Sequence, residues 1–111
     1  MGSHRTARAD VARPVRRPWR AALVLVCREC DGARGFGPKQ VRSALKQGVK
    51  ADLPPKSVRV ASVSCLDICP KRATCVAVSG AGEALVTVSG PAGAAEVVDR
   101  IGSALADEPP A

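Results

Sequence analysis

The residues of this chain best suited to chemistry are its five cysteines, because it has only one histidine. Two residues separate Cys27 from Cys30, three separate Cys65 from Cys69, and Cys75 follows in the same half of the chain. Thiolates bind soft metals, exchange with disulfides and act as nucleophiles. In a chain with no secretory signal, two close pairs and a fifth thiol indicate metal binding or redox chemistry before structural disulfides.

The spacing of the second pair bears on which metal these thiols would bind. All-thiolate tetrahedral sites suit zinc or iron–sulfur clusters. Zinc ribbons usually combine two pairs that each enclose two residues, whereas Cys65 and Cys69 enclose three. The wider loop would let both sulfurs reach a two-iron cluster, and Pro70 stiffens the turn behind them. The pattern matches neither the plant-type nor the two-cluster bacterial ferredoxin spacing. It favours an iron–sulfur cluster and leaves zinc open.

The residues around the cysteines suggest how a bound group would be stabilised. Four basic residues flank the two loops, namely Arg28, Arg34, Lys71 and Arg72. Positive charge favours thiolates and a negatively charged reduced cluster, and it raises the reduction potential. The glycine-rich residues 31–37 either hydrogen-bond the sulfurs through their N–H groups or only turn the chain into a helix. Phe36 is expected to pack in the core, and Asp67 to cap its own loop.

The apolar pattern predicts the elements that position these cysteines. Residues 22–26 form a continuous apolar run, which is typical of a strand buried on both faces. Pro38 suits the first turn of a helix, and Gly48 suits its C-terminal cap. Residues 58–63 alternate as a second strand. Each cysteine pair therefore begins at the carboxyl end of a predicted strand.

The rest of the chain predicts a hairpin and a second helix. Residues 75–79 and 84–88 flank a glycine-containing turn, as in two antiparallel strands. Gly90 and Pro91 then precede an amphipathic helix, whose apolar face is formed by Ala94, Val97, Val98, Ile101 and Leu105. The order β-α-β-β-β-α, with the first two strands parallel, predicts an α/β fold, a minimal thioredoxin-like sandwich with helices packed on a mixed sheet. Four or five sulfurs would then converge, because the carboxyl ends of neighbouring parallel strands meet at one edge.

Three segments of the sequence carry a family resemblance. Residues 25–30, 65–70 and 75–78, with the hairpin and last helix that follow, resemble the thioredoxin-like [2Fe-2S] ferredoxin group and its small metal-binding relatives over residues 22–106. The resemblance implies a [2Fe-2S] cluster that carries one electron. The ligands that it implies are Cys27, Cys30, Cys65 and Cys69. Better-known members have widely separated first-loop ligands, whereas Cys30 lies close to Cys27, so Cys75 is the alternative fourth ligand.

The length of 111 residues suits one domain with tails. We predict a disordered Arg/Pro-rich leader over residues 1–20, a thioredoxin-like ferredoxin domain over residues 21–106, and a short flexible tail over residues 107–111. Arg16 and Arg17 precede an apolar run as in an export signal, but that run is short and no cleavage site follows it. We therefore expect a cytoplasmic protein. The longest apolar run, residues 21–27, is far below the roughly 20 residues that span a bilayer, so no membrane is expected.

The charge distribution bears on the partner. The net charge is +7, with residues 1–72 strongly basic and residues 73–111 acidic. Such a basic region suits an acidic redox partner protein. Trp19 and Phe36 are the only aromatic residues, which argues against stacking on nucleic-acid bases and makes nucleic acid the lesser alternative. The oligomeric state stays open, with a homodimer as one option.

Other functions would use the same residues. One is a structural zinc module that binds a protein or nucleic-acid partner. Another is a thiol–disulfide oxidoreductase that uses Cys27 and Cys30, although seven residues separate Cys30 from the predicted helix start that would lower a thiol pKa. A third is a small domain whose cysteines are only buried apolar residues. Because no catalytic constellation is present, we expect an electron carrier or redox-responsive accessory protein rather than an enzyme.

Overall fold

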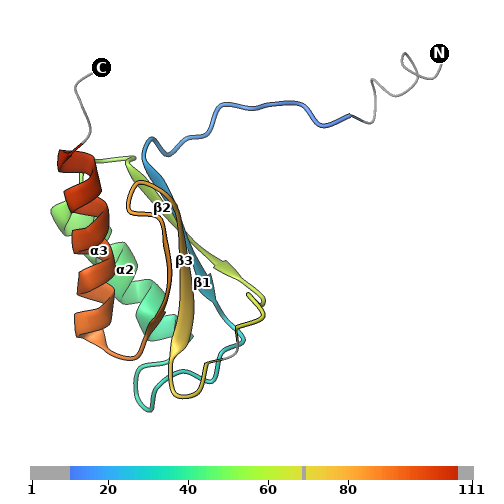
Figure 1. The fold of residues 1–111 in the computed structure, drawn as a ribbon, viewed down its shortest axis with the longest axis vertical. Coiled ribbons are helices and arrows are strands. Elements are labelled where there is room, and N and C mark those ends of the chain that lie inside the picture. The colour runs from blue at the N-terminus through green and yellow to red at the C-terminus, as the bar shows by residue number, and fades with distance from the viewer. Residues whose placement is uncertain (1–10, 69, 108–111) are drawn as a thin grey trace.

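The computed structural model describes residues 11–68 and 70–107. Its elements are, in order, β1 (Ala22–Cys27), α2 (Pro38–Asp52), β2 (Val58–Val63), β3 (Thr74–Gly80), β4 (Ala84–Val88) and α3 (Pro91–Ala106) (Figure 1). The order β-α-β-β-β-α and the α/β class are those predicted. The predicted fold class, two helices packed on a four-stranded mixed sheet, is therefore confirmed.

The strand order explains why the two cysteine loops lie at one end of the sheet. The strands lie in the order β2-β1-β3-β4. β1 pairs with β2 in parallel, with Ala22 opposite Val58 and Cys27 opposite Val63, and α2 provides the crossover between them. β3 pairs antiparallel with both β1 and β4. The chain therefore leaves β1 and β2 at the same end and enters β3 there.

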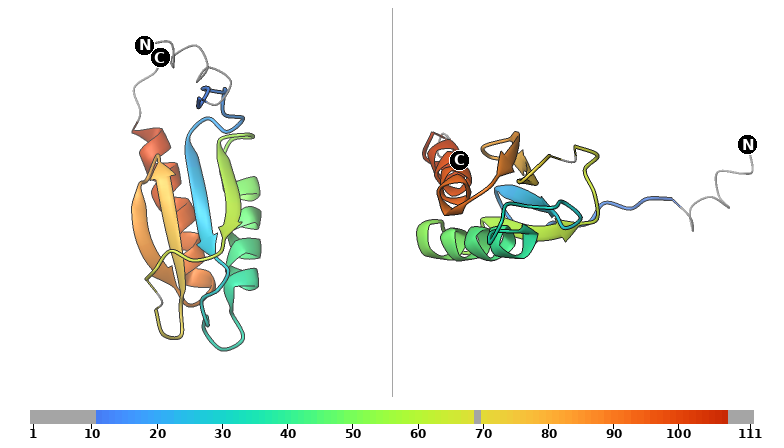
Figure 2. Two further views of the ribbon diagram at one scale, coloured as in Figure 1. Left: turned by 90° about the vertical axis from the view of Figure 1, so that its right-hand side faces the viewer. Right: turned by 90° about the horizontal axis from the view of Figure 1, so that it is seen from below.

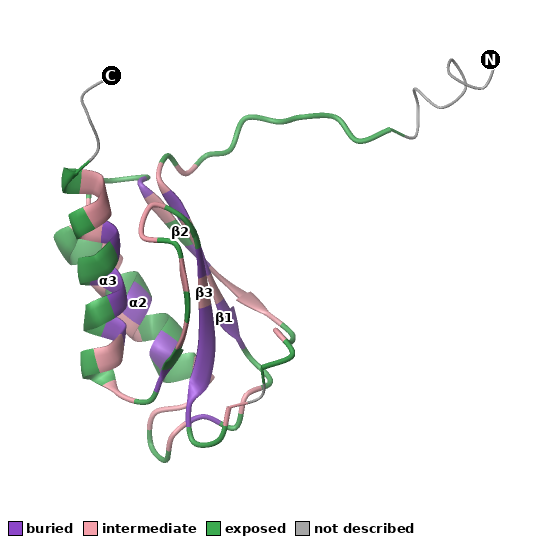
Figure 3. Cartoon of the chain, viewed as in Figure 1, coloured by how far each residue is buried: buried purple, intermediate pink, exposed green. Residues whose placement is uncertain are grey.

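Both helices cover the same face of the sheet (Figure 2). The side chains that point toward them form the buried core, which includes Val24 and Val26 from β1, Val76 and Val78 from β3, Val41 and Leu45 from α2, and Val97, Val98 and Ile101 from α3 (Figure 3). The alternate β1 side chains, Leu23 and Leu25, are only partly buried. The expectation that this strand is buried on both faces is therefore wrong, because no helix covers the second face among the described residues.

The end of α2 also differs from the expectation. Gly48 is not its cap, because the helix continues to Asp52 and the Leu53 N–H still donates to the Val49 carbonyl at 3.0 Å. It ends before Pro54, which disfavours helical backbone in the residue before it and donates no hydrogen bond. A Cβ on Gly48 would lie 2.9 Å from Val98 Cγ2 of α3. The glycine therefore allows close packing of the two helices.

Part of the predicted tails lies outside the described residues. These are residues 1–10 of the leader and residues 108–111 of the C-terminal tail. The domain boundaries therefore stay predictions. In the ranges that the structure describes, neither helix has the length and apolar character needed to cross a membrane.

Candidate functional site

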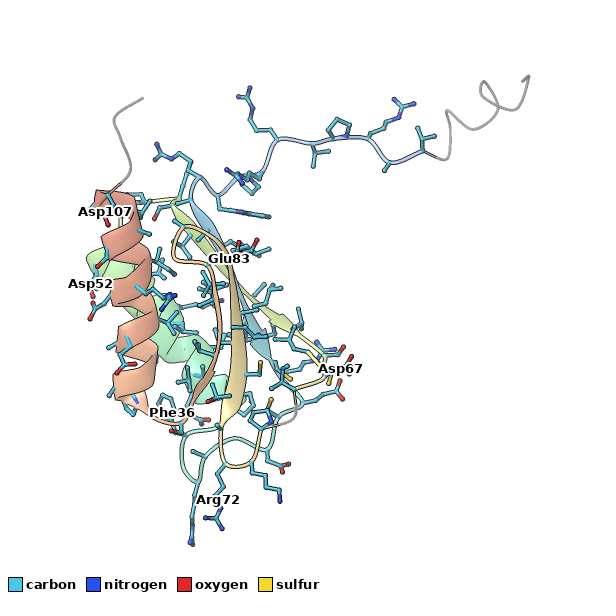
Figure 4. All side chains as sticks on the ribbon, in the orientation of Figure 1. Phe36, Asp52, Asp67, Arg72, Glu83 and Asp107 are labelled. Carbon is cyan, nitrogen blue, oxygen red and sulfur yellow. The ribbon has the colours of Figure 1, made fainter. Side chains whose placement is uncertain are left out.

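Four cysteines from different elements lie at the end of the sheet where β1 and β2 finish. Cys27 is the last residue of β1 and Cys75 is the second residue of β3. Cys30 follows in the loop after β1, and Cys65 lies in the loop after β2. Their sulfur atoms gather at this end, on the side where Asp67 lies (Figure 4). Cys27, Cys30 and Cys75 are free thiols, and Cys69 lies outside the described residues.

The four thiols extend from the interior to the surface. Cys27 and Cys75 are 2% and 1% exposed, so both are buried. Cys30 is intermediate and Cys65 is exposed. A metal ion or cluster bound among them would therefore have buried ligands on one side and a solvent-exposed ligand on the other.

Hydrogen bonds through sulfur connect the two loops and β3. The side chains of Cys27 and Cys30 are hydrogen-bonded to each other. The Cys75 N–H donates to Cys30 Sγ at 3.4 Å, and the Cys27 thiol donates to the Ser64 carbonyl at 3.6 Å. Sulfur atoms therefore join three stretches of backbone that are far apart in the sequence.

Cys65 is held within its own turn. The Asp67 N–H donates to Cys65 Sγ at 3.3 Å, and the Cys65 thiol donates to Asp67 Oδ1 at 3.8 Å. Asp67 adopts a left-handed backbone with φ of 60°, a conformation that Asp tolerates better than most residues. Both of these hydrogen bonds of Asp67 are with the Cys65 sulfur, so its role as a cap of the loop backbone stays a prediction.

Cys27 differs from Cys30 and Cys75 in how readily its thiol loses a proton, as the directions of their pKa shifts show. Burial raises the pKa of Cys27, but the hydrogen bond from the Cys30 side chain opposes it. The backbone N–H groups of Glu29, Leu66 and Cys30 act in the same direction, so the pKa of Cys27 lies below its usual value. Burial is the main reason that the pKa values of Cys30 and Cys75 are raised, and negative charge on Cys27 raises both further. Of these three thiols, Cys27 therefore loses its proton most readily.

The glycine-rich loop turns the chain and supplies none of these N–H donors. The donors to Cys27 and Cys30 come from residues that flank the cysteines or from β3. Gly32 has φ of 75°, and a Cβ there would lie 2.7 Å from Gly37 Cα, because the loop folds back on itself. Gly37 then begins α2, and its N–H donates to Gln40 Oε1 at 3.0 Å. Of the two alternatives for these glycines, the structure favours the turn.

The other flanking residues lie as expected. Phe36 is partly buried and packs against the core, which confirms its predicted role. The four basic residues of the loops are all exposed: Arg28, Arg34, Lys71 and Arg72. Arg72 projects from this end of the molecule (Figure 4). The acidic residues of the same loops, Glu29, Asp31 and Asp67, are exposed as well, so the surface around the thiols carries charges of both signs.

The donor chemistry fits a thiolate-bound metal, but the described residues alone do not form a complete metal site. Thiols backed by N–H donors suit zinc or an iron–sulfur cluster. Within residues 11–68 and 70–107, no three or more His, Cys, Asp or Glu side chains form a group that could hold a metal ion. The fourth predicted ligand, Cys69, lies outside those ranges. The four-cysteine site therefore stays a prediction.

Sequence reasoning found the cysteines but missed the backbone groups that contact them. The N–H of Leu66 and the carbonyl of Ser64 both contact Cys27 from the other loop. Almost every residue has a backbone N–H and a carbonyl, so residue type could not identify these two. The only signal in the sequence was that Ser64 and Leu66 flank Cys65.

The chain was also compared with known proteins. No protein-family model, curated protein or solved structure matches it. Membership of the thioredoxin-like [2Fe-2S] ferredoxin group therefore stays a prediction from the motifs.

Proposed function

We propose that this chain is a small iron–sulfur protein whose [2Fe-2S] cluster is bound by Cys27, Cys30, Cys65 and Cys69, with Cys75 as the alternative to Cys30. One observation carries the proposal: thiols from two loops and from β3 interact with one another at one end of the sheet. When bound, such a cluster supplies one-electron transfer. The residues around it would determine its potential and access.

The residues of the chain have distinct roles in this proposal. The N–H groups of Glu29 and Leu66 stabilise negative charge on the Cys27 sulfur, and hydrogen bonds to ligand sulfurs raise the reduction potential. Burial of Cys27 keeps one side of the site dry. Cys65 is exposed, so its side of the site lies near the surface where an electron enters or leaves.

The proposed partner is an acidic redox protein in the cytoplasm. Exposed basic side chains around the cysteine loops, such as Arg28 and Lys71, would pair with carboxylates of the partner. Charge complementarity of this kind speeds association and orients the partner. Such a protein would work as an electron carrier or as a redox-responsive accessory protein, rather than as an enzyme.

A second candidate is thiol–disulfide exchange, favoured by the hydrogen-bonded pair Cys27 and Cys30 and the lowered pKa of Cys27. The Cys27 thiolate would attack a substrate disulfide and form a mixed disulfide. The Cys30 thiol would lose its proton, attack Cys27 and release the reduced substrate, leaving a Cys27–Cys30 disulfide. This candidate ranks second because Cys27 is 2% exposed and α2 begins only at Pro38, too far along the chain to activate it.

The first test is the composition of the full chain purified without oxygen from iron-replete cells. We expect a red-brown protein with iron and acid-labile sulfide in equal amounts and, after reduction, the electron paramagnetic resonance signal of a one-electron centre. A colourless protein with one zinc would overturn the proposal in favour of a structural module. Reversible thiol oxidation in a metal-free protein would favour the second candidate.

Single substitutions then identify the ligands. Cys27→Ser, Cys65→Ser and Cys69→Ser should each remove the colour, and comparison of Cys30→Ser with Cys75→Ser names the fourth ligand. Ile68→Ser is the matched control, because this exposed side chain lies in the same loop and carries no thiol. Circular dichroism checks that each variant is folded. Full iron content in all five cysteine variants would contradict the proposal.

A further inference from the structure

A groove lies at the other end of the sheet, between the C-terminal half of α2 and the start of β2, with a volume of about 590 Å³. Its floor is aliphatic and includes Val49, Leu53 and Val58. Four basic side chains also line it: Lys46, Lys50, Lys56 and Arg59. None of its lining residues is acidic. Since β2 begins at this groove and Cys65 follows its far end, the groove is separate from the cysteine site.

The end of the groove is fixed by hydrogen bonds that need no ligand. The buried Ser57 donates to the Pro54 carbonyl both from its hydroxyl, at 2.6 Å, and from its N–H, at 3.2 Å. Arg20 donates from its guanidinium to the Pro55 carbonyl at 3.2 Å and from its N–H to the Lys56 carbonyl at 2.9 Å. The groove is therefore preformed, which lowers the entropic cost of binding.

The β2 side of the groove is the open edge of the sheet. Among the described strands, only β1 pairs with β2. The carbonyls of Ser57 and Val63 accept hydrogen bonds from the β1 side. Because backbone groups alternate in direction along a strand, those of Val58, Val60 and Ser62 point toward the open edge. An open edge of this kind can pair with another strand.

We propose that this groove binds an extended peptide segment of a partner protein, in which acidic and aliphatic residues alternate, and that the segment adds to β2 as a new edge strand. Main-chain hydrogen bonds to β2 would supply affinity, and the side chains would supply specificity. Aliphatic side chains suit the floor at Val49 and Leu53. Carboxylates suit Lys50 and Arg59, which have no acidic neighbour in the groove lining. The groove lining itself has no aromatic side chain on which nucleic-acid bases would stack, and Trp19 lines a neighbouring pocket beside Lys56 and Arg59.

The first test uses a fluorescent peptide of alternating glutamate and valine. Its binding to the full chain is measured by fluorescence anisotropy. Binding should weaken as salt is added, because salt screens the exposed charges. Amide hydrogen exchange should slow at Val60 and Ser62 when the peptide is bound. The same peptide with alternate backbone nitrogens methylated should not bind, because it cannot pair with β2. Absence of binding, or slowed exchange only in the cysteine loops, would overturn the proposal.

Charge reversal in the groove gives a matched comparison. Lys50→Glu and Arg59→Glu should each weaken binding about tenfold, since like charges would face each other. Arg100→Glu makes the same change in α3 beside β4, at the opposite edge of the sheet. It should alter affinity by less than about twofold, because three strand spacings, about 14 Å, exceed the screening length. Equal losses for Arg100→Glu and Lys50→Glu would overturn the proposal. So would tighter binding of single-stranded RNA than of the peptide. None of these outcomes depends on the cysteines, so this proposal and the iron–sulfur proposal fail separately.

Discussion

Among the described residues, sulfur atoms accept backbone hydrogen bonds at one end of the sheet and not at the other. At the groove end the acceptors are carbonyl oxygens, as where Ser57 donates twice to Pro54. At the cysteine end the Asp67 N–H donates to Cys65 Sγ and the Cys75 N–H donates to Cys30 Sγ. A thiol sulfur is a weak acceptor, whereas a thiolate accepts charge-assisted hydrogen bonds, which are stronger.

The two ends therefore differ in whether their hydrogen bonds need ionised groups. The groove end has strong acceptors without any bound group. The cysteine end reaches its strongest hydrogen bonding only when its thiols lose their protons, as metal binding requires. We therefore expect the two ends to respond independently to substitution.

The largest expected effect is a reciprocal loss of function at the two ends. Cys27→Ser should reduce the iron content of the anaerobically purified protein to background, because it removes a buried ligand whose thiol pKa is lowered. It should leave affinity for the acidic peptide unchanged. Lys50→Glu should retain full iron content and bind the peptide about tenfold more weakly. Iron analysis and anisotropy on the same samples measure both. Loss of peptide binding in Cys27→Ser would show that the ends are coupled.

The next effect concerns how tightly each end packs its backbone. Gly80 lies at the groove end with φ of 103°, and a Cβ there would collide with the Ala21 carbonyl oxygen. Gly80→Ala should cost about 3 kcal/mol of unfolding free energy, because an unfavourable backbone angle and a steric clash add together. Gly35 in the cysteine-end loop has φ of 77° and open space around it. Gly35→Ala should cost only about 1 kcal/mol.

Urea unfolding of the two variants measures this difference. Both are glycine-to-alanine changes at positive φ, so the difference isolates the backbone contact. Equal costs for Gly80→Ala and Gly35→Ala would contradict the view that the backbone is closely packed around Gly80 and open around Gly35.

The sequence predicted most of the fold because its strands have simple patterns. Alternation predicted residues 58–63 as the strand that the structure calls β2, and the hairpin strand over residues 84–88 was also predicted to the residue. Gly90 and Pro91 located the start of α3, because proline is favoured in the first turn of a helix. The predicted strand ends also located the cysteine loops, because loops that follow neighbouring parallel strands lie at the same end of the sheet.

The features that sequence missed depend on partners distant in the chain. Gly48 suits a cap locally, and only the opposing Val98 of α3 shows why it is glycine. The run at residues 22–26 suits full burial, and only the position of both helices on one face leaves Leu25 partly exposed. The groove likewise required the strand order, because without it nothing indicates that β2 is an edge strand.

The smallest expected effect tests whether the groove end is stabilised by its own hydrogen bonds. Ser57→Ala removes the 2.6 Å hydrogen bond from the hydroxyl to the Pro54 carbonyl. The hydrogen bond from the backbone N–H of residue 57 to the same carbonyl remains. The free energy of unfolding should fall by about 1 kcal/mol, and peptide affinity by about threefold, because part of the preorganisation of the groove is lost. Ser43→Ala, at an exposed position of α2, should change neither quantity beyond about 0.5 kcal/mol. Iron content should be unchanged in both variants, since no thiol or sulfur-bonded N–H is altered. A fall in iron content in Ser57→Ala alone would mean that the groove end also supports the cysteine loops, and the independence of the two ends would be wrong.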